Sequence, residues 1–189
     1  MNPGKLKLLA KSIFVRAGMA DEQAALVADV LVWADLRGMG SHGVMRVPRY
    51  VELIRRGDMN ARPQMKLLSE TAATAHLDAD RAAGPVAMTR GAELAIGKAR
   101  QSGIGLALVR STTHTAALGY YTQRGARAGM AMIALAASGP NMAYHGARAA
   151  GVSTAPLSIA VPGGHDSSIP SACRCPTSTW TSASSAGAR

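Results

Sequence analysis

Ser41, His42, Arg46 and Tyr50 lie within ten positions of one another, in a glycine-rich stretch that follows a predicted helix. An arginine guanidinium can hold a carboxylate through two parallel hydrogen bonds, and an imidazole can exchange a proton near neutral pH. Glycines let the backbone approach a bound molecule closely. The stretch therefore predicts a site for a small carboxylate. A capped loop with surface arginines is the plainer interpretation that the residues alone leave open.

A second histidine, His114, follows the continuous apolar run of residues 104–109. That run has the length and the glycine boundary of a buried strand, and α/β proteins place reactive groups just beyond the ends of such strands. His114 is thus a candidate for proton transfer. The alternative is a structural histidine that is held by hydrogen bonds after the strand.

The other candidate motifs are weaker. Gly103-Ile104-Gly105 resembles the start of a dinucleotide fingerprint, but Leu108 stands at the third glycine position, and the glycines precede a strand instead of linking a strand to a helix. The sequence contains neither a Walker sequence nor an HExxH helix. His76 in an edge-like strand, His145 in a loop and His165 near the C-terminus are interpreted as exposed or structural residues.

Helical spacing dominates the first third of the chain. Apolar residues recur at helical intervals in three segments, each with a capping glycine or an early proline. The segments are residues 6–17, the stretch that starts at Asp21 and ends before Gly38, and residues 48–56. We expect these helices to form an N-terminal helical lobe over residues 1–62, which must position the Ser41–Tyr50 stretch.

Strands and helices alternate in the part that follows, residues 63–163. Short alternating or apolar runs predict strands at residues 65–70, 74–78, 104–109, 130–136 and 156–161, and helices are predicted at residues 84–100 and 118–127. This alternation predicts an α/β architecture with some parallel pairing. The loop that carries His114 would lie between a strand and a helix of this part.

Composition narrows the class of protein. The chain has 189 residues, of which 48% are hydrophobic and 17% charged, as in an ordinary globular protein. No apolar run approaches the ~20 residues that span a bilayer, and the N-terminus lacks a secretory signal pattern, so a cytoplasmic protein without a membrane partner is expected. Cys173 and Cys175, one residue apart, are a poor disulfide or zinc signal, so no metal is expected.

The positive charge is uneven along the chain. The formal net charge is +10, and from Leu94 onward there are 8 basic residues against one acidic residue, Asp166. No basic cluster with interleaved aromatic residues accompanies this excess, so a nucleic-acid partner is not expected. A positive half-chain also suits an anionic cofactor and a carboxylate substrate, and missing acidic sequence would explain it equally well.

The two histidine stretches together resemble a known family. Ser41-His42-Gly43 with Arg46 and Tyr50, followed by Ser-x-x-His-x-x-x-x-Gly-Tyr-Tyr from Ser111, is similar to the type 2 malate/L-lactate dehydrogenase family. That family also contains ureidoglycolate, sulfolactate and diketogulonate oxidoreductases and cyclic-imine carboxylate reductases. The resemblance covers residues 5–163 and continues through Gly129-Met130, Ala137-Ser138-Gly139-Pro140 and the run from Pro156 to Pro162.

The resemblance implies a fold distinct from the Rossmann type, incomplete in this chain, and a homodimer in the full-length protein. It also implies NAD or NADP as the cofactor and a small 2-hydroxy or 2-oxo acid as the substrate. His114 matches the acid/base residue, His42 and Arg46 match positions near the substrate, and Tyr50 could close the same pocket. Ser138 matches a position that contacts the cofactor. Alternatives are a cyclic-imine carboxylate reductase on the same scaffold, an inactive fragment, or a basic binding module.

Two departures from the family pattern stand near the C-terminus. Where the family usually shows Gly-Thr-Asn-Pro, this chain has Ser153-Thr154-Ala155-Pro156. After residue 163 the sequence becomes a mixture of serine, threonine, alanine, cysteine and arginine without strand or helix period, and Trp180 is its only large apolar residue from Pro170 onward. We expect residues 164–189 to be disordered, and the abrupt change of composition motivates the hypothesis of a reading-frame shift shortly after Gly164.

Overall fold

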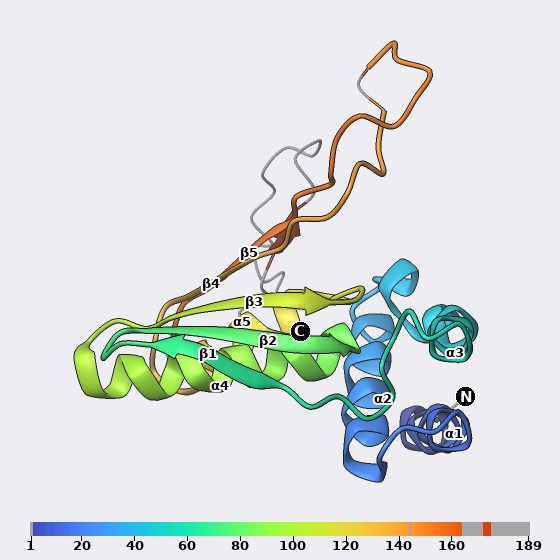
Figure 1. The fold of residues 1–189 in the computed structure, drawn as a ribbon, viewed down its shortest axis with the longest axis horizontal. Coiled ribbons are helices and arrows are strands. Elements are labelled where there is room, and N and C mark those ends of the chain that lie inside the picture. Colours follow the sequence, from blue (N-terminus) through green and yellow to red (C-terminus); the bar gives the residue numbers. More distant parts are fainter. Residues whose placement is uncertain (1, 144, 164–171, 175–189) are drawn as a thin grey trace, which may run out of the picture.

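Three helices form the N-terminal lobe of the computed structural model, which describes residues 2–143, 145–163 and 172–174 (Figure 1). They are α1 (Pro3–Arg16), α2 (Asp21–Asp35) and α3 (Val47–Arg55), with two short 3₁₀ turns, η1 (Gly40–His42) and η2 (Val44–Arg46), between the last two. The lobe confirms the three predicted helices. None of the helices in the described part of the chain is long and apolar enough to cross a membrane.

Local chemistry explains where these helices begin. The Asn2 side chain accepts a hydrogen bond from the Gly4 N–H (2.8 Å) and Pro3 occupies the first turn of α1, where its missing N–H costs nothing. Asp21 and Glu22 place negative charge at the positive end of the α2 dipole. The apolar faces of the helices then meet in one core, in which Phe14, Leu31 and Tyr50 are fully buried.

A three-stranded sheet adjoins this lobe. Its strands are β1 (Lys66–Glu70), β2 (Thr74–Ala82) and β3 (Leu106–Thr112), in the order β1-β2-β3, with β1 antiparallel and β3 parallel to β2. The parallel crossover is α4 (Gly84–Ser102), which covers one face of the sheet (Figure 1). Gly91 of α4 makes this packing close, because a side chain there would meet Val109 of β3 at 2.7 Å.

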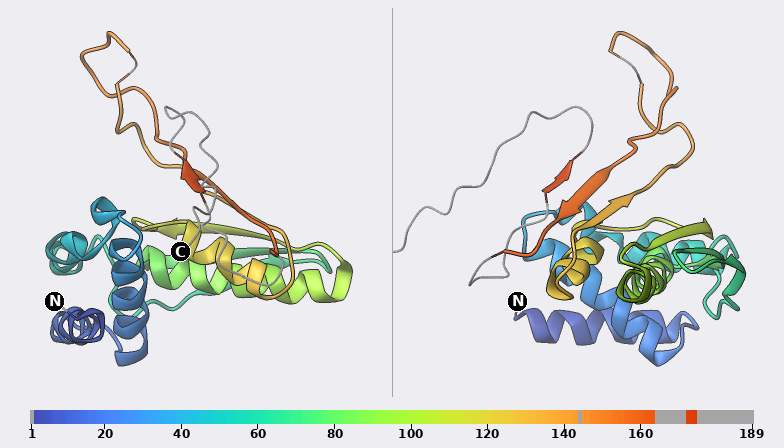
Figure 2. Two further views of the ribbon diagram at one scale, coloured as in Figure 1. Left: turned by 180° about the vertical axis from the view of Figure 1, so that it is seen from behind. Right: turned by 90° about the vertical axis from the view of Figure 1, so that its left-hand side faces the viewer.

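A second small sheet follows α5 (Gly119–Arg127). It contains β4 (Met132–Leu135), β5 (Leu157–Ala160) and β6 (Ala172–Arg174), each antiparallel to its neighbour in the order β4-β5-β6. One face of β5 packs on α5, where the hydroxyls of Ser158 and Thr122 lie 2.9 Å apart in a buried hydrogen bond. The connection between β4 and β5 extends away from the body as an arm, whose described residues are 136–143 and 145–156 (Figure 2).

The predicted α/β class is confirmed, and so is the reading of Gly103. This residue ends α4 in a left-handed conformation (φ 78°) and so joins a helix to a strand, as predicted, not a strand to a helix.

Two local predictions were wrong. The run at residues 104–109 is not a fully buried strand, since Leu106 and Leu108 are 51% and 57% exposed on the face that α4 does not cover. His76 does not lie in an edge strand, because β3 pairs with β2 on the side opposite β1 and makes β2 central.

The predicted disordered segment, residues 164–189, lies outside the described residues apart from its positions 172–174. Those three residues form β6 at the edge of the second sheet, where the sequence predicted no strand.

Candidate active site

His114 lies in the tight connection between β3 and α5, as expected for a residue just beyond a strand. The backbone around it is unusual, because Ser111 and Ala116 both adopt positive φ angles (53° and 54°), which non-glycine residues seldom do. Two contacts hold the connection in this shape. The fully buried Tyr121 donates its hydroxyl hydrogen to the Thr115 carbonyl (2.6 Å), and the Gly84 N–H donates to the Thr113 hydroxyl (3.2 Å).

Gly84 at the start of α4 lets the helix pack directly on the His114 backbone. A Cβ added at Gly84 would lie 2.2 Å from the His114 carbonyl oxygen and 2.5 Å from the Thr115 Cα. A real Cβ cannot approach these atoms so closely, so only glycine allows α4 to begin here without moving His114. The sequence showed a Gly84-Pro85 helix start, but it carried no signal that the glycine faces a site residue 30 positions away.

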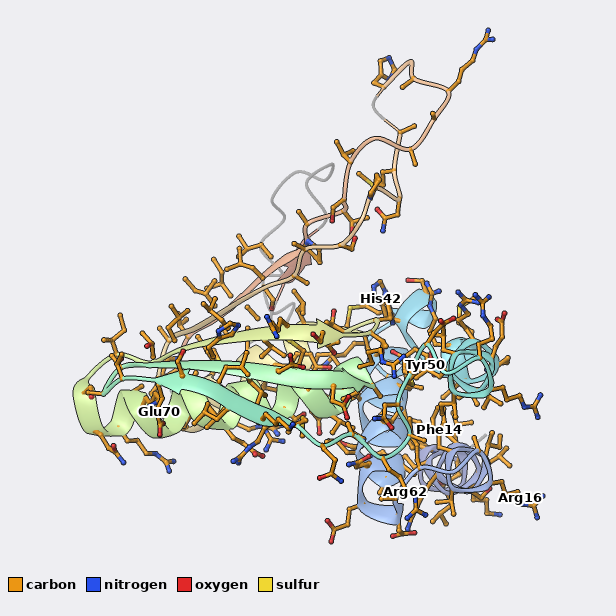
Figure 3. All side chains as sticks on the ribbon, viewed as in Figure 1. Phe14, Arg16, His42, Tyr50, Arg62 and Glu70 are labelled. Atoms are coloured by element: carbon orange, nitrogen blue, oxygen red, sulfur yellow. The ribbon has the colours of Figure 1, made fainter. Side chains whose placement is uncertain are left out.

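Tyr50 of α3 contacts His114 from the other side. Its hydroxyl lies 2.9 Å from the imidazole Nδ1 and 3.0 Å from the carbonyl oxygen of the same residue, and the tyrosine itself is fully buried. The two rings meet edge to face, with their centroids 6.0 Å apart. Figure 3 shows Tyr50 where the helical lobe meets the ends of the strands. The structure therefore joins two residues that are 64 positions apart in the sequence.

His42 brings a second imidazole to the same place. Its ring stacks on that of His114 with centroids 5.5 Å apart and an interplanar angle of 30°. The Ser41 hydroxyl lies 2.9 Å from the His42 Nδ1. Arg46 donates from Nε to the Ser41 carbonyl (2.5 Å), which leaves its terminal amino groups without a carboxylate partner among the described residues.

Asp35, at the end of α2, positions the turn that carries His42 and Arg46. Its Oδ2 accepts a hydrogen bond from the Val44 N–H (2.9 Å), and a Cβ added at Gly43 would lie only 1.7 Å from its Oδ1. The carboxylate thus packs directly against Gly43, and any other residue at that position would displace the Asp35 side chain. Sequence reasoning missed Asp35, although an acidic residue directly before the glycine-rich stretch was the visible signal.

Burial keeps both imidazoles neutral. Burial, and after it the positive charges of Arg46 and His42, lowers the pKa of His114 to about 4. The pKa of His42 is lowered as well, first by burial and then by Arg46. Burial raises the pKa of the Tyr50 hydroxyl, so that group stays protonated. At neutral pH the site holds two uncharged imidazoles beside one guanidinium, an arrangement that can accept a proton next to a bound anion.

Ser138, the predicted cofactor contact, lies on the arm and not in this cluster. Its hydroxyl is 3.0 Å from the Ser153 hydroxyl, and its N–H donates to the same Ser153 oxygen (3.1 Å). Nearby, Ala155 adopts a positive φ of 37°, which a non-glycine residue seldom does, so the arm holds a strained residue.

A hollow beside α4 does not coincide with the histidines. It has a volume of about 390 Å³ and lies between α4 and the segment before β4, with Gly103, Gly105, Gly125 and Gly129 in its lining. These residues carry no group that could transfer a proton or hold an anion by its side chain. We therefore place the candidate active site at His114, where titratable groups converge, and not at the hollow.

Of the predicted site residues, the structure brings together His42, Arg46, Tyr50 and His114 and leaves Ser138 apart. This cluster combines two imidazoles, a guanidinium and a buried phenol at the junction of the helical lobe and the sheet. With the fold, it defines a class of protein that can bind a small anion and move a proton.

Residues 1–172 match the family described as malate/L-lactate dehydrogenase, and the chain belongs to that family. Among curated relatives, the ureidoglycolate dehydrogenase (NAD(+)) of Escherichia coli O157:H7 is 39% identical over 161 residues, which cover 85% of this chain and 46% of the relative. The malate dehydrogenase of Pyrococcus abyssi is 39% identical over 150 residues, or 79% of this chain and 41% of the relative. The chain thus spans about half the length of the curated relatives it matches.

Solved structures agree with this assignment. The malate dehydrogenase of Pyrococcus horikoshii OT3 superposes with a TM-score of 0.83 at 35% identity, covering 87% of this chain and 47% of that one. The sulfolactate dehydrogenase of Methanocaldococcus jannaschii gives a TM-score of 0.82 at 34% identity, with 87% and 48% covered. The Δ1-piperideine-2-carboxylate reductase of Pseudomonas syringae gives 0.78 at 27% identity, with 87% and 49% covered.

Proposed function

We propose that this chain belongs to an oxidoreductase that interconverts a small 2-hydroxy acid and its 2-oxo acid with NAD or NADP. The observation that carries the proposal is the neutral imidazole of His114 stacked on His42, beside Arg46, whose positive charge lowers the His114 pKa and which forms no ion pair with a described residue. The reaction requires a base and a cation close together, because the substrate has a hydroxyl that must be deprotonated and a carboxylate that must be bound.

His114 acts as the base in the oxidation direction. It takes the proton of the substrate hydroxyl while the C–H electron pair leaves the same carbon as hydride, and a carbonyl double bond forms. In the reverse direction the protonated imidazole returns the proton to the carbonyl oxygen. The nicotinamide ring, when bound, accepts or supplies the hydride. The lowered pKa keeps the imidazole free of a proton before the hydroxy acid binds.

Arg46 and His42 orient the substrate. The terminal amino groups of Arg46 are available for two parallel bonds to a carboxylate, since only its Nε is engaged, with the Ser41 carbonyl. The His42 imidazole, held at Nδ1 by the Ser41 hydroxyl, offers its other ring nitrogen to the substrate oxygens. These contacts would fix the carboxylate end of the substrate while its C2 atom faces His114.

The cofactor contact assigned to Ser138 rests on the family resemblance and on its exposed place in the arm, where its hydroxyl and that of Ser153 can both reach a polar ligand. A homodimer, a cytoplasmic location and the choice between NAD and NADP are likewise expectations drawn from the resemblance.

A second candidate is reduction of a cyclic imine carboxylate. It is favoured by the structural likeness to a Δ1-piperideine-2-carboxylate reductase. The demands on the site are similar, because hydride goes to the imine carbon and a proton to the imine nitrogen while a cation holds the carboxylate.

An assay separates the two candidates. Oxidation of NADH and of NADPH is followed at neutral pH with a panel of 2-oxo acids and, separately, with a cyclic imine carboxylate. We expect turnover with at least one 2-oxo acid and a preference for one cofactor. Turnover with the imine alone would replace the proposal by the second candidate. No turnover with either class would remove the enzymatic function from this chain.

A further inference from the structure

We propose that Tyr50 is a positioning residue, which fixes the neutral His114 as the tautomer with its proton on Nδ1 and the lone pair on Nε2. The family resemblance suggests that Tyr50 closes the substrate pocket, and this stays a prediction. The structure directs its hydroxyl to His114, so this contact affects the reaction through the imidazole. That catalytic consequence rests on the proposed function, whereas the tautomer itself does not.

Two contacts of the Tyr50 hydroxyl determine which ring nitrogen of His114 carries the proton. The Tyr50 hydroxyl lies within hydrogen-bond distance of two atoms, the His114 carbonyl oxygen at 3.0 Å and the His114 Nδ1 at 2.9 Å. A carbonyl oxygen can only accept, and a phenol has one hydrogen to donate. Both short contacts are satisfied together only if the hydroxyl donates to the carbonyl and accepts from an Nδ1–H. A neutral imidazole with its proton on Nδ1 has its lone pair on Nε2.

The reverse arrangement leaves the His114 carbonyl without a donor. If Tyr50 donated to Nδ1, the carbonyl would lose its tyrosine donor, and no backbone N–H of the described residues donates to that oxygen. A carbonyl left unsatisfied in this part-buried place costs free energy, which favours the tautomer with its proton on Nδ1.

The surroundings prevent the pair from rearranging. Tyr50 is fully buried, and its ring packs against Phe14 with centroids 6.1 Å apart, as Figure 3 shows for the two labelled residues. On the other side, the start of α4 leaves no space at the carbonyl, since a Cβ at Gly84 would lie 2.2 Å from it. The Tyr50 ring and the His114 backbone are thus both fixed in place, and among the described residues the phenol hydrogen-bonds only to His114.

The charged and titratable groups that face His114 do not compete for Nδ1. They are His42 from η1, Arg46 from η2 and Tyr50 from α3, and the adjoining start of α4 contributes only backbone. No side chain of the described residues hydrogen-bonds Nε2. The locked tautomer therefore presents its lone pair at the ring nitrogen that remains open, which is the arrangement a base needs.

The tautomer can be observed without substrate or cofactor. The chain is labelled with ¹⁵N-histidine, and long-range ¹H–¹⁵N correlations at pH 7.5 report which ring nitrogen of His114 carries the proton. A His114→Asn variant identifies the signals of this ring. We expect the proton on Nδ1 in the unaltered chain, and a redistribution toward Nε2 in Tyr50→Phe, because the acceptor that holds the proton on Nδ1 is gone.

Tyr121→Phe is the matched control. It also removes the hydroxyl of a fully buried tyrosine, one that binds the carbonyl of Thr115 next to His114, but it touches neither ring nitrogen. We expect this variant to keep the proton on Nδ1. A proton on Nε2 in the unaltered chain, which can be read even if a variant fails to fold, would overturn the proposal. So would an unchanged tautomer in Tyr50→Phe, or equal shifts in both variants.

The outcomes separate this inference from the proposed function. A locked tautomer in a chain without turnover would leave the inference standing and remove the function. If turnover is lost in His114→Ala but His114 of the unaltered chain carries its proton on Nε2, the proposed function stands and the inference about the tautomer fails.

Discussion

His114 ties the stability of the fold to pH. The folded protein holds its imidazole neutral with a pKa lowered to about 4, whereas an unfolded histidine titrates near its ordinary value of 6.5. Between these two values the unfolded chain binds more protons than the folded one. Stability from this group is therefore fully present above about pH 6.5 and is lost as the pH falls toward 4.

We predict that His114→Asn flattens this dependence. Between pH 6.5 and 4 the unaltered chain should lose about 1–3 kcal/mol more unfolding free energy than the variant, after allowance for the partial exposure of the ring. The measurement is urea unfolding of both proteins at half-unit pH steps. Because His42 has its own lowered pKa and is present in both proteins, its contribution cancels in the comparison. Parallel pH curves would show that His114 is not buried as a neutral group.

Residue types and local spacing were enough to select His42, Arg46, Tyr50 and His114. They were not enough to say what each side chain touches. For Tyr50, the resemblance suggested a place in the substrate pocket, which stays a prediction. Nothing in the sequence showed that its ring enters the core and that its hydroxyl meets a residue 64 positions later. Such a contact depends on how the helical lobe packs on the sheet, which no local pattern encodes.

The start of α4 is the element on which the position of His114 depends. We predict that Gly84→Ala destabilises the protein by about 1–3 kcal/mol, because the added methyl group must displace the His114 carbonyl or the first turn of the helix. Gly97→Ala is the control within the same helix. A side chain there meets nothing within 4 Å, so alanine should be neutral or stabilise by about 0.5–1 kcal/mol.

Chemical unfolding of both variants checks this prediction. Equal midpoints for Gly84→Ala and Gly97→Ala would mean that α4 does not press on the His114 connection. A lower midpoint for Gly84→Ala alone would support the packing described here.

At the level of elements, periodicity predicted the helices and strands well, because each helix buries a stripe that is visible in the sequence. Long-range pairing was harder. The apolar run at residues 104–109 predicted a strand buried on both faces, yet only one of its faces meets α4. The parallel crossover from β2 to β3 makes β2 the central strand, so His76 lies in the middle of the sheet. No local sequence pattern specifies this order of strands.

Seen as a whole, the molecule exposes an apolar sheet face on β4 and β5. Ile133 pairs across the strands with Ile159, and Leu135 with Leu157, and all four side chains are exposed on the face that α5 does not cover. Leu135 is 68% exposed. Contiguous apolar surface of this kind promotes association in water.

We predict that Leu135→Gln combined with Ile159→Gln lowers binding of a hydrophobic dye and reduces light scattering at high protein concentration. Leu36→Gln is the control, since Leu36 is 60% exposed at the end of α2, in the helical lobe and away from this sheet. Unchanged dye binding in the double variant, or an equal decrease in the control, would show that the face is not what drives association.

We propose that His114 is the acid/base group of an NAD(P)-linked reaction of a 2-oxo acid. A rate comparison tests this role, with 2-oxo-acid-dependent NADH or NADPH oxidation measured for the unaltered chain, His114→Ala, and His145→Ala, which removes an exposed histidine of the arm. We expect a loss of about 10²–10⁴-fold in His114→Ala and the full rate in His145→Ala. Turnover that survives in His114→Ala, or no turnover in the unaltered chain, would contradict it.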